Sequence, residues 1–213
     1  MNWINVFDSE FCLPEQVCVV APGPRGVGHY NEIPKGFSII AVSKAVMIPE
    51  LRPKVWVMNH VQQSWYQEAS KSFRGIRVFG YDAVTAAKLM ATPGENEDAE
   101  SAQFYFKLPK EPLGLEEFVP IDGCIRIGAT TSACAVQLAY NFGATEIVLC
   151  GVDMSGDAYF DGTMNENPYH GDTWPAAARL NVLIHWLTVN RGLQISSISP
   201  TKLNVPHFHN RQL

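Results

Sequence analysis

Long hydrophobic runs are missing from this sequence, since no stretch approaches the roughly 20 apolar residues that a transmembrane helix needs. The N-terminal residues carry Asp8 and Glu10 and lack the basic region that opens a secretory signal peptide. These two absences predict a cytoplasmic protein with no transmembrane segment.

An excess of positive charge is missing as well. The formal net charge is -5 at pH 7, whereas general nucleic-acid binding requires a basic face that neutralises phosphates. We therefore expect no nucleic-acid partner, although a local basic patch around one small anion stays compatible with this charge.

Metal-binding and disulfide motifs are also absent. The five cysteines form an odd set with no CxxC pair, and Cys18 and Cys150 lie in apolar runs, which predicts buried free thiols. Asp153, Asp157 and Asp161 lack the glycine and the final glutamate of a calcium loop. We therefore predict no metal site.

Apolar runs of strand length recur along the chain and alternate with helical patterns. Strands are predicted at residues 16–21, 37–42, 54–58, 76–79, 146–150 and 193–198, and helices at 61–72, 130–142 and 175–191. The acidic stretch 92–100 is predicted to be an exposed loop. This order predicts a single Rossmann-like α/β domain over residues 1–213, with a mainly parallel sheet and helices on both faces.

The turn after the first predicted strand, Ala21-Pro22-Gly23-Pro24-Arg25, is the first candidate site. Open parallel sheets bind ligands beyond the carboxyl ends of their strands. Gly23 allows close approach of the backbone to a phosphate, and the Arg25 guanidinium can hold that phosphate in a bidentate manner. A plain Gly/Pro turn is the alternative, because the P-loop and G-x-G-x-x-G patterns are both absent.

Polar residues also follow the next two predicted strands. Ser43 and Lys44 come after the second strand, and Asn59 and His60 come after the third. Each residue taken singly suits a structural cap, but together they predict a polar edge that can hold a nucleotide.

The segment that leads into the helix at 130–142 offers an anion site. Thr130, Thr131 or Ser132 can cap the helix, whose N-terminus favours an anion. Arg126 would lie beside the same site, with an ordinary surface arginine as the alternative.

A long polar and aromatic loop follows the strand at 146–150. It begins after Asp153, which is predicted to contact the nucleotide, and residues 154–173 are predicted to form an active-site lid. His170 at its end suits a general base, although an inert, exposed loop histidine is the alternative.

Taken together, these segments resemble the bacterial lipooligosaccharide sialyltransferases (glycosyltransferase family 42) and the broader group of motility accessory factors and 6-hydroxymethylpterin diphosphokinase-like proteins. The similarity covers about residues 17–206 and is strongest over 126–153, where Arg126, Cys134, Glu146 and Asp153 keep the sialyltransferase spacing. The segment 19–24 resembles the nucleotide loop of that family.

The resemblance implies a role for each matching residue. Gly23, Pro24 and Asn59 match contacts to the nucleotide of a CMP-sugar, and His170 falls where the catalytic base lies. Arg126 matches an active-site arginine.

Tyr159 corresponds to one of two tyrosines that hold the leaving phosphate. The second of these positions is Ser155, and Ser43 stands where the sialyltransferases have an asparagine. Arg25 replaces a serine of the family loop and adds charge that would suit a diphosphate.

The resemblance therefore implies a metal-independent glycosyltransferase without a cofactor, which moves a sugar from a CMP-activated donor to a hydroxyl of a glycan or small-molecule acceptor. Assembly into a homo-oligomer is compatible with this family. Two alternatives stay open: a Mg²⁺- and ATP-dependent diphosphokinase-like transferase that uses Asp153 or Asp157, and a non-catalytic nucleotide-binding domain.

Overall fold

A single eight-stranded sheet forms the centre of the protein. The computed structural model describes residues 3–59, 65–80, 103–107, 125, 130–154, 158–164 and 174–208. The strand order is β1-β6-β5-β4-β3-β2-β7-β8, and the paired strands all run parallel. The strands are β1 (Ile4–Asn5), β2 (Gln16–Val20), β3 (Ser38–Val42), β4 (Val55–Met58), β5 (Ile76–Gly80), β6 (Gln103–Phe106), β7 (Glu146–Cys150) and β8 (Gln194–Ser197).

The central strands are apolar on both faces because both faces are covered. The four residues Val17 to Val20 of β2 are all completely buried. Their side chains alternate, so that Val17 and Val19 join one core, while Cys18 and Val20 join another. This is the pattern of a parallel strand between two layers.

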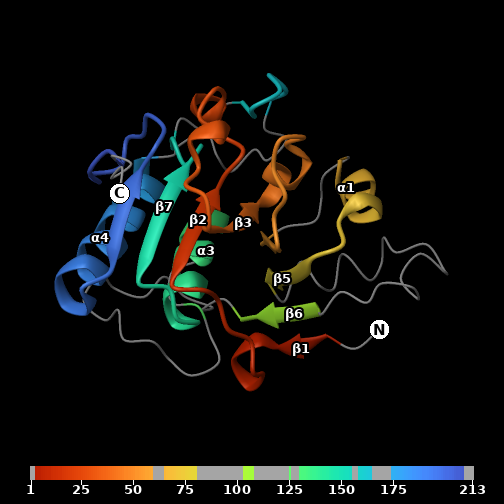
Figure 1. The fold of residues 1–213 in the computed structure, drawn as a ribbon, viewed down its shortest axis with the longest axis horizontal. Coiled ribbons are helices and arrows are strands. Elements are labelled where there is room, and N and C mark those ends of the chain that lie inside the picture. Colours follow the sequence, from red (N-terminus) through yellow and green to blue (C-terminus); the bar gives the residue numbers. More distant parts are fainter. Residues whose placement is uncertain are drawn as a thin grey trace.

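Two helices cover the first face of the sheet. Helix α3 (Thr131–Asn141) packs across β2, β3 and β4, and helix α4 (Trp174–Arg191) packs beside β8. In Figure 1, α3 lies behind β2 and β7. Small buried residues, among them Ala133, Cys134 and Ala139, let α3 lie close against the sheet.

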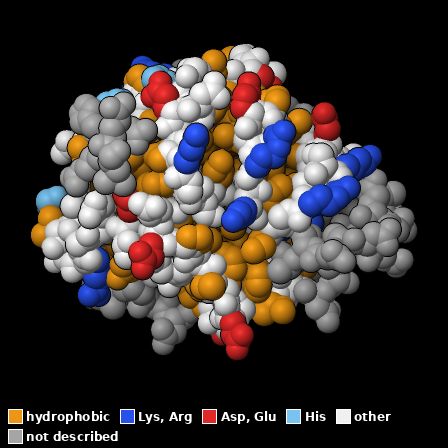
Figure 2. All heavy atoms as spheres, viewed as in Figure 1, with side chains coloured by type: hydrophobic (Ala, Val, Ile, Leu, Met, Phe, Trp, Pro, Cys, Tyr) orange, Lys and Arg blue, Asp and Glu red, His pale blue; other side chains and the backbone are white. Residues whose placement is uncertain are grey.

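Shorter elements cover the second face. Helix α1 (Tyr66–Ser72) packs on an aromatic core around Trp56 and Phe79. The 3₁₀ helices η2 (Pro24–Gly26), η3 (Tyr30–Glu32) and η4 (Ser43–Met47) follow β2 and β3, and a further one, η1 (Val6–Asp8), follows β1. Figure 2 views the molecule from the side opposite α3 and shows Lys and Arg side chains interspersed with hydrophobic ones.

The predicted architecture is confirmed, with additions at one edge. The six predicted strands form within a residue or two of their predicted bounds, and helices α3 and α4 match the ranges 130–142 and 175–191. Strands β1 and β6 were not predicted. Strand β1 has only two residues, which carry no periodic pattern, and β6 mixes Gln103 with aromatic residues. Of the helix predicted at 61–72, α1 is described, whereas residues 61–64 and the predicted loop 92–100 lie outside the described residues.

None of the helices in the described part of the chain combines the length and the hydropathy required to cross a bilayer.

Candidate active site at the carboxyl edge of the sheet

The order of the strands reverses between β2 and β7. From β2 the chain proceeds outward through β3, β4 and β5, whereas β7 returns to the opposite side of β2. A parallel sheet binds ligands where such a reversal separates the loops that follow two adjacent strands. The turns after β2 and β7 therefore define the candidate site.

These two turns pack directly against each other. The Gly23 amide donates to the Gly151 carbonyl at 3.1 Å, and the Ala21 amide donates to the Cys150 carbonyl at 2.9 Å. A Cβ atom at Gly23 would overlap the Gly151 carbonyl oxygen and lie 2.6 Å from Asp153 Cγ. Glycine at position 23 is thus required by the contact between the turns.

Asp153 stabilises the turn that follows β2. Its side chain is buried, and Oδ2 accepts a hydrogen bond of 3.1 Å from the Arg25 amide. Asp153 was predicted to contact the nucleotide, whereas in this structure its carboxylate accepts a hydrogen bond from the protein's own backbone. The Arg25 side chain is exposed at the same turn, where it is accessible to an anion.

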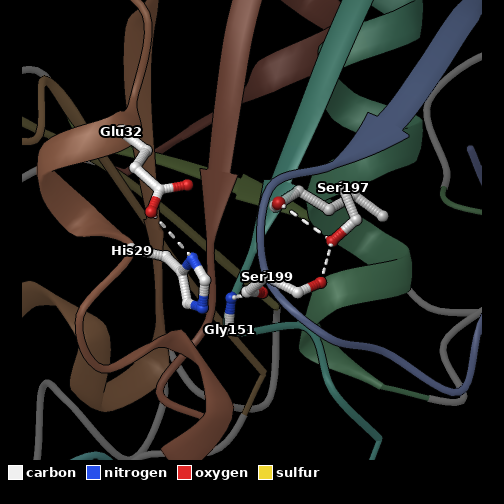
Figure 3. A network of polar contacts seen from close by, with 6 residues as sticks. His29, Glu32, Gly151, Ser197 and Ser199 are labelled. Atoms are coloured by element: carbon white, nitrogen blue, oxygen red, sulfur yellow. Dashed lines mark hydrogen bonds and ion pairs between the residues drawn. The ribbon is translucent and has the colours of Figure 1, made fainter. Parts of the chain in front are cut away.

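Hydroxyl groups in β8 and in the segment after it form hydrogen bonds that support the turn after β7 (Figure 3). Ser199 Oγ accepts from the Gly151 amide at 2.8 Å, and the Ser197 hydroxyl donates to the Ser199 carbonyl at 2.7 Å. Thr201 Oγ1 donates to the Val152 carbonyl at 2.6 Å. The segment after β8 therefore fixes the position of the β7 turn.

The turn after β3 contains a strained residue. Ser43 has a φ of 49°, in the left-handed region that serine rarely adopts, and its carbonyl accepts from the Trp56 indole at 2.9 Å. The next residue, Lys44, is buried, and its ammonium lies 2.7 Å from both Asp161 Oδ2 and Thr163 Oγ1. Lys44 was predicted as part of the polar edge that can hold a nucleotide, whereas its ammonium contacts Asp161 and Thr163 of the protein itself.

Residues 158–164 form a short hairpin within the predicted lid. An antiparallel bridge joins Ala158 to Met164, and the Phe160 amide donates to the Pro22 carbonyl at 2.7 Å. Tyr159 is buried, with its ring centroid 5.0 Å from Lys44 Nζ. The 158–164 hairpin thus bridges the turns that follow β2 and β3.

Asn59 follows β4 and faces helix α3. Its side-chain amide donates to Cys134 Sγ at 3.3 Å, and the residue is 2% exposed. Within the described part of the chain, no donor reaches the buried carbonyl oxygen Oδ1 of Asn59. A buried acceptor without a partner is costly, and such a group often marks a ligand position.

The N-terminus of α3 lies at the same edge, because α3 runs back across the sheet before entering β7. Of the three candidates, Thr130 is the cap, and its hydroxyl accepts from the Ala133 amide at 3.0 Å. Thr131 and Ser132 occupy the first turn, where amide groups have no partner within the helix. The first turn is thus positioned to receive an anion.

A histidine and carboxylate pair also occurs near this edge. His29 Nδ1 and Glu32 Oε1 lie 3.2 Å apart in the segment that follows the Gly23 turn (Figure 3). Both side chains are partly exposed. This pair was not predicted, although the spacing i, i+3 in a short helical turn is its signal in the sequence.

Burial raises the pKa of the cysteines in the core. The pKa values of the Cys134 and Cys150 thiols are both raised to about 12, in each case chiefly by burial, and the pKa of Cys18 is also raised. The prediction of buried free thiols at Cys18 and Cys150 is confirmed.

Several predicted site residues lie outside the described residues, namely Arg126, His170, Ser155, Asp157 and His60. The described edge brings together Gly23, Pro24, Arg25, Ser43, Asn59, Thr131, Ser132, Asp153 and Tyr159. Among the residues with described positions, no group of three or more His, Cys, Asp or Glu side chains is arranged to hold a metal ion.

A cavity of about 1110 Å³ lies elsewhere, along β8 and α4. Its lining includes Lys35, His185 and His207, and it contains none of the predicted site residues. The candidate site is therefore defined by the topology of the sheet and by the contacts between its turns, not by this cavity.

No family model, curated protein or solved structure matches this chain.

Proposed function

We propose that the protein is a sialyltransferase-like glycosyltransferase, which binds a CMP-activated sugar at the carboxyl edge of the sheet and transfers the sugar to a hydroxyl acceptor. The observation that carries this proposal is the buried Oδ1 atom of Asn59, which has no hydrogen-bond partner among the described residues and lies close to the N-terminus of α3. An acceptor oxygen suits a nucleoside donor group such as the amino group of cytosine, and the helix terminus suits the phosphate.

The remaining groups of the edge suit the chemistry of such a transfer. The Gly23 turn offers the exposed Arg25 guanidinium to the phosphate. Tyr159 belongs to the 158–164 hairpin, which contacts the turn after β2 through the Phe160 amide. A phenol hydroxyl suits this chemistry, because stabilisation of a departing phosphate by hydrogen-bond donors is a large term in catalysis. The resemblance assigns the base to His170 and a further phosphate contact to Arg126.

Thermal unfolding in the presence of nucleotides tests the proposal. CMP at a large excess over its dissociation constant is expected to raise the melting temperature by several degrees, equally with and without Mg²⁺, because ligand binding to the folded state stabilises it. AMP and UMP are expected to give smaller shifts. Measurement by scanning fluorimetry requires no knowledge of the acceptor.

Two variants connect that shift to the site. Arg25→Gln is expected to weaken CMP binding about tenfold, because a charge-assisted bond to phosphate is lost. Arg74→Gln, which changes another exposed arginine far along the chain, is the matched control and is expected to leave binding unchanged. His170→Ala is expected to abolish sugar transfer while the CMP shift persists.

The outcomes separate the alternatives. A melting shift with ATP that requires Mg²⁺ and is absent with CMP would favour the diphosphokinase-like function. CMP binding without hydrolysis or transfer from any CMP-sugar would favour a non-catalytic nucleotide-binding domain. The absence of a shift with every nucleotide would contradict the proposal altogether.

A further inference from the structure

Lys44 is the least expected charge at the carboxyl edge of the sheet. Its side chain is only 8% exposed, although a buried ammonium is costly unless it is paired and hydrogen-bonded. Two oxygens satisfy it, Asp161 Oδ2 and Thr163 Oγ1, each at 2.7 Å. Both belong to the 158–164 hairpin, more than a hundred residues further along the chain.

The hairpin is organised around these two contacts. Asp161 Oδ1 accepts from both the amide and the hydroxyl of Thr163, at 3.1 and 2.7 Å, while its Oδ2 faces Lys44. The Tyr159 amide closes the hairpin by donating to the Thr163 carbonyl at 2.9 Å. The contacts of Lys44 and the hydrogen bonds that close the hairpin therefore form one connected network.

The same network reaches the proposed donor site. The ring of Tyr159 lies below the Lys44 ammonium, 5.0 Å from it, and the Phe160 amide donates to Pro22 in the turn after β2. Since the ammonium is already shared between a carboxylate, a hydroxyl and an aromatic face, its donors serve the hairpin rather than a ligand phosphate.

We propose that Lys44 is a positioning residue that fixes the 158–164 hairpin, and with it Tyr159, as a permanent wall of the donor site. The part of the predicted lid at 158–164 is then fixed before a ligand binds. This inference rests on the proposed function only for the role of Tyr159 in catalysis. The fixing of the hairpin is a property of the protein without ligand.

The structure predicts an asymmetry between the two partners. Asp161→Asn leaves a buried ammonium without its counter-charge, which strongly disfavours the closed hairpin. Lys44→Met leaves a carboxylate whose side chain is 35% exposed and stays hydrated. The aspartate variant is therefore expected to loosen the hairpin more than the lysine variant does.

Hydrogen exchange measured by mass spectrometry on the protein without ligand tests this inference. The amides of Tyr159, Phe160 and Gly162 are expected to exchange about tenfold faster in Asp161→Asn and about threefold faster in Lys44→Met. Lys54→Met, at an exposed lysine, is the matched control and is expected to match the wild type. Thr163→Val, at an exposed position that keeps the charges, is expected to give a smaller increase and guards against variants that fail to fold.

The double variant Lys44→Met/Asp161→Asn is expected to exchange more slowly than the sum of the single effects predicts, because its buried site no longer holds an unpaired charge. Hairpin amides that exchange at the wild-type rate in Asp161→Asn would overturn the proposal, as would equal effects of Asp161→Asn and Lys54→Met.

Donor kinetics separate positioning from simple folding. Lys44→Met is expected to lower kcat about tenfold with the KM for the donor changed by less than about twofold, because Tyr159 acts mainly on charge that develops in the transition state. Lys44→Arg, which keeps the charge, is expected to restore part of kcat. If CMP binds neither wild type nor variants, the proposed function fails while the exchange result still decides the role of Lys44.

Discussion

At the scale of single residues, the ionised carboxylate of Asp161 helps to hold the 158–164 hairpin in place. Burial by itself raises the pKa of this carboxyl, but hydrogen bonds from Lys44 and Thr163 outweigh burial and lower the pKa to about 2. The usual value in an unfolded chain is about 3.9. The Asp161 carboxylate therefore contributes stability that is fully present above about pH 4 and is lost as the pH falls through about 2.

The lowered pKa of Asp161 predicts how the stability that the ion pair contributes depends on pH. Between pH 7 and pH 4.5 the difference in melting temperature between wild type and Asp161→Asn is expected to stay constant, and below pH 4 it is expected to shrink. Scanning calorimetry at stepped pH values measures it. A difference that already disappears between pH 7 and pH 5 would show that Asp161 is not held by Lys44 in solution.

At the scale of structural elements, the contact between the β2 and β7 turns makes a separate prediction. Gly23 has a φ of -66°, which any residue adopts, so Gly23→Ala introduces no backbone strain. Its Cβ would nevertheless meet the Gly151 carbonyl and the Asp153 carboxylate. Such overpacking typically costs about 1–3 kcal/mol, and denaturant unfolding measures the loss.

Gly36→Ala is the contrasting variant. Gly36 has a φ of 95°, and a Cβ atom at this position would meet nothing within 4 Å, so this change introduces strain without a clash. Gly23→Ala is expected to abolish CMP binding as well as lower stability, whereas Gly36→Ala is expected to lower stability alone. Intact CMP binding in Gly23→Ala would contradict a role for this turn at the site.

The elements also show how far sequence alone can go. Strands β2, β3, β4 and β7 were predictable because parallel strands that are buried on both faces consist of continuous apolar runs. Their order then placed the residues after each strand at one edge, which is why Gly23 and Asn59 were predicted to lie there. Strand β1 was not predictable, because its two residues form a strand only through pairing with β6.

Contacts between residues that lie far apart in the sequence could not be predicted. The pairing of Lys44 with Asp161 depends on tertiary packing, since 117 positions separate the two residues. The carboxylate of Asp153 likewise binds the Arg25 amide, although its place after a strand indicated a ligand contact. The carboxyl edge of the sheet could thus be predicted from the sequence. The direction of each side chain at that edge could not, because it depends on how the turns pack against one another.

At the scale of the whole molecule, three buried cysteines in the described part of the chain report on the two cores that the sheet separates. Cys134 belongs to the core beneath α3 and α4, whereas Cys18 and Cys150 belong to the core on the opposite face. All three are completely buried, while Cys12 is exposed. Alkylation of each thiol therefore requires that its side of the sheet opens.

We expect the three buried thiols to be alkylated at one common rate in mild denaturant, because both cores share strands β2 and β7 and neither can open without loosening them. At pH 8 the raised pKa values further suppress the reaction in the folded protein, since the thiolate is the nucleophile. Pulse alkylation followed by mass spectrometry assigns each rate, and Cys12, which reacts without unfolding, serves as the control. If Cys18 and Cys150 react about tenfold faster than Cys134, the layer of 3₁₀ helices opens by itself, and the sheet then separates two units of unequal stability.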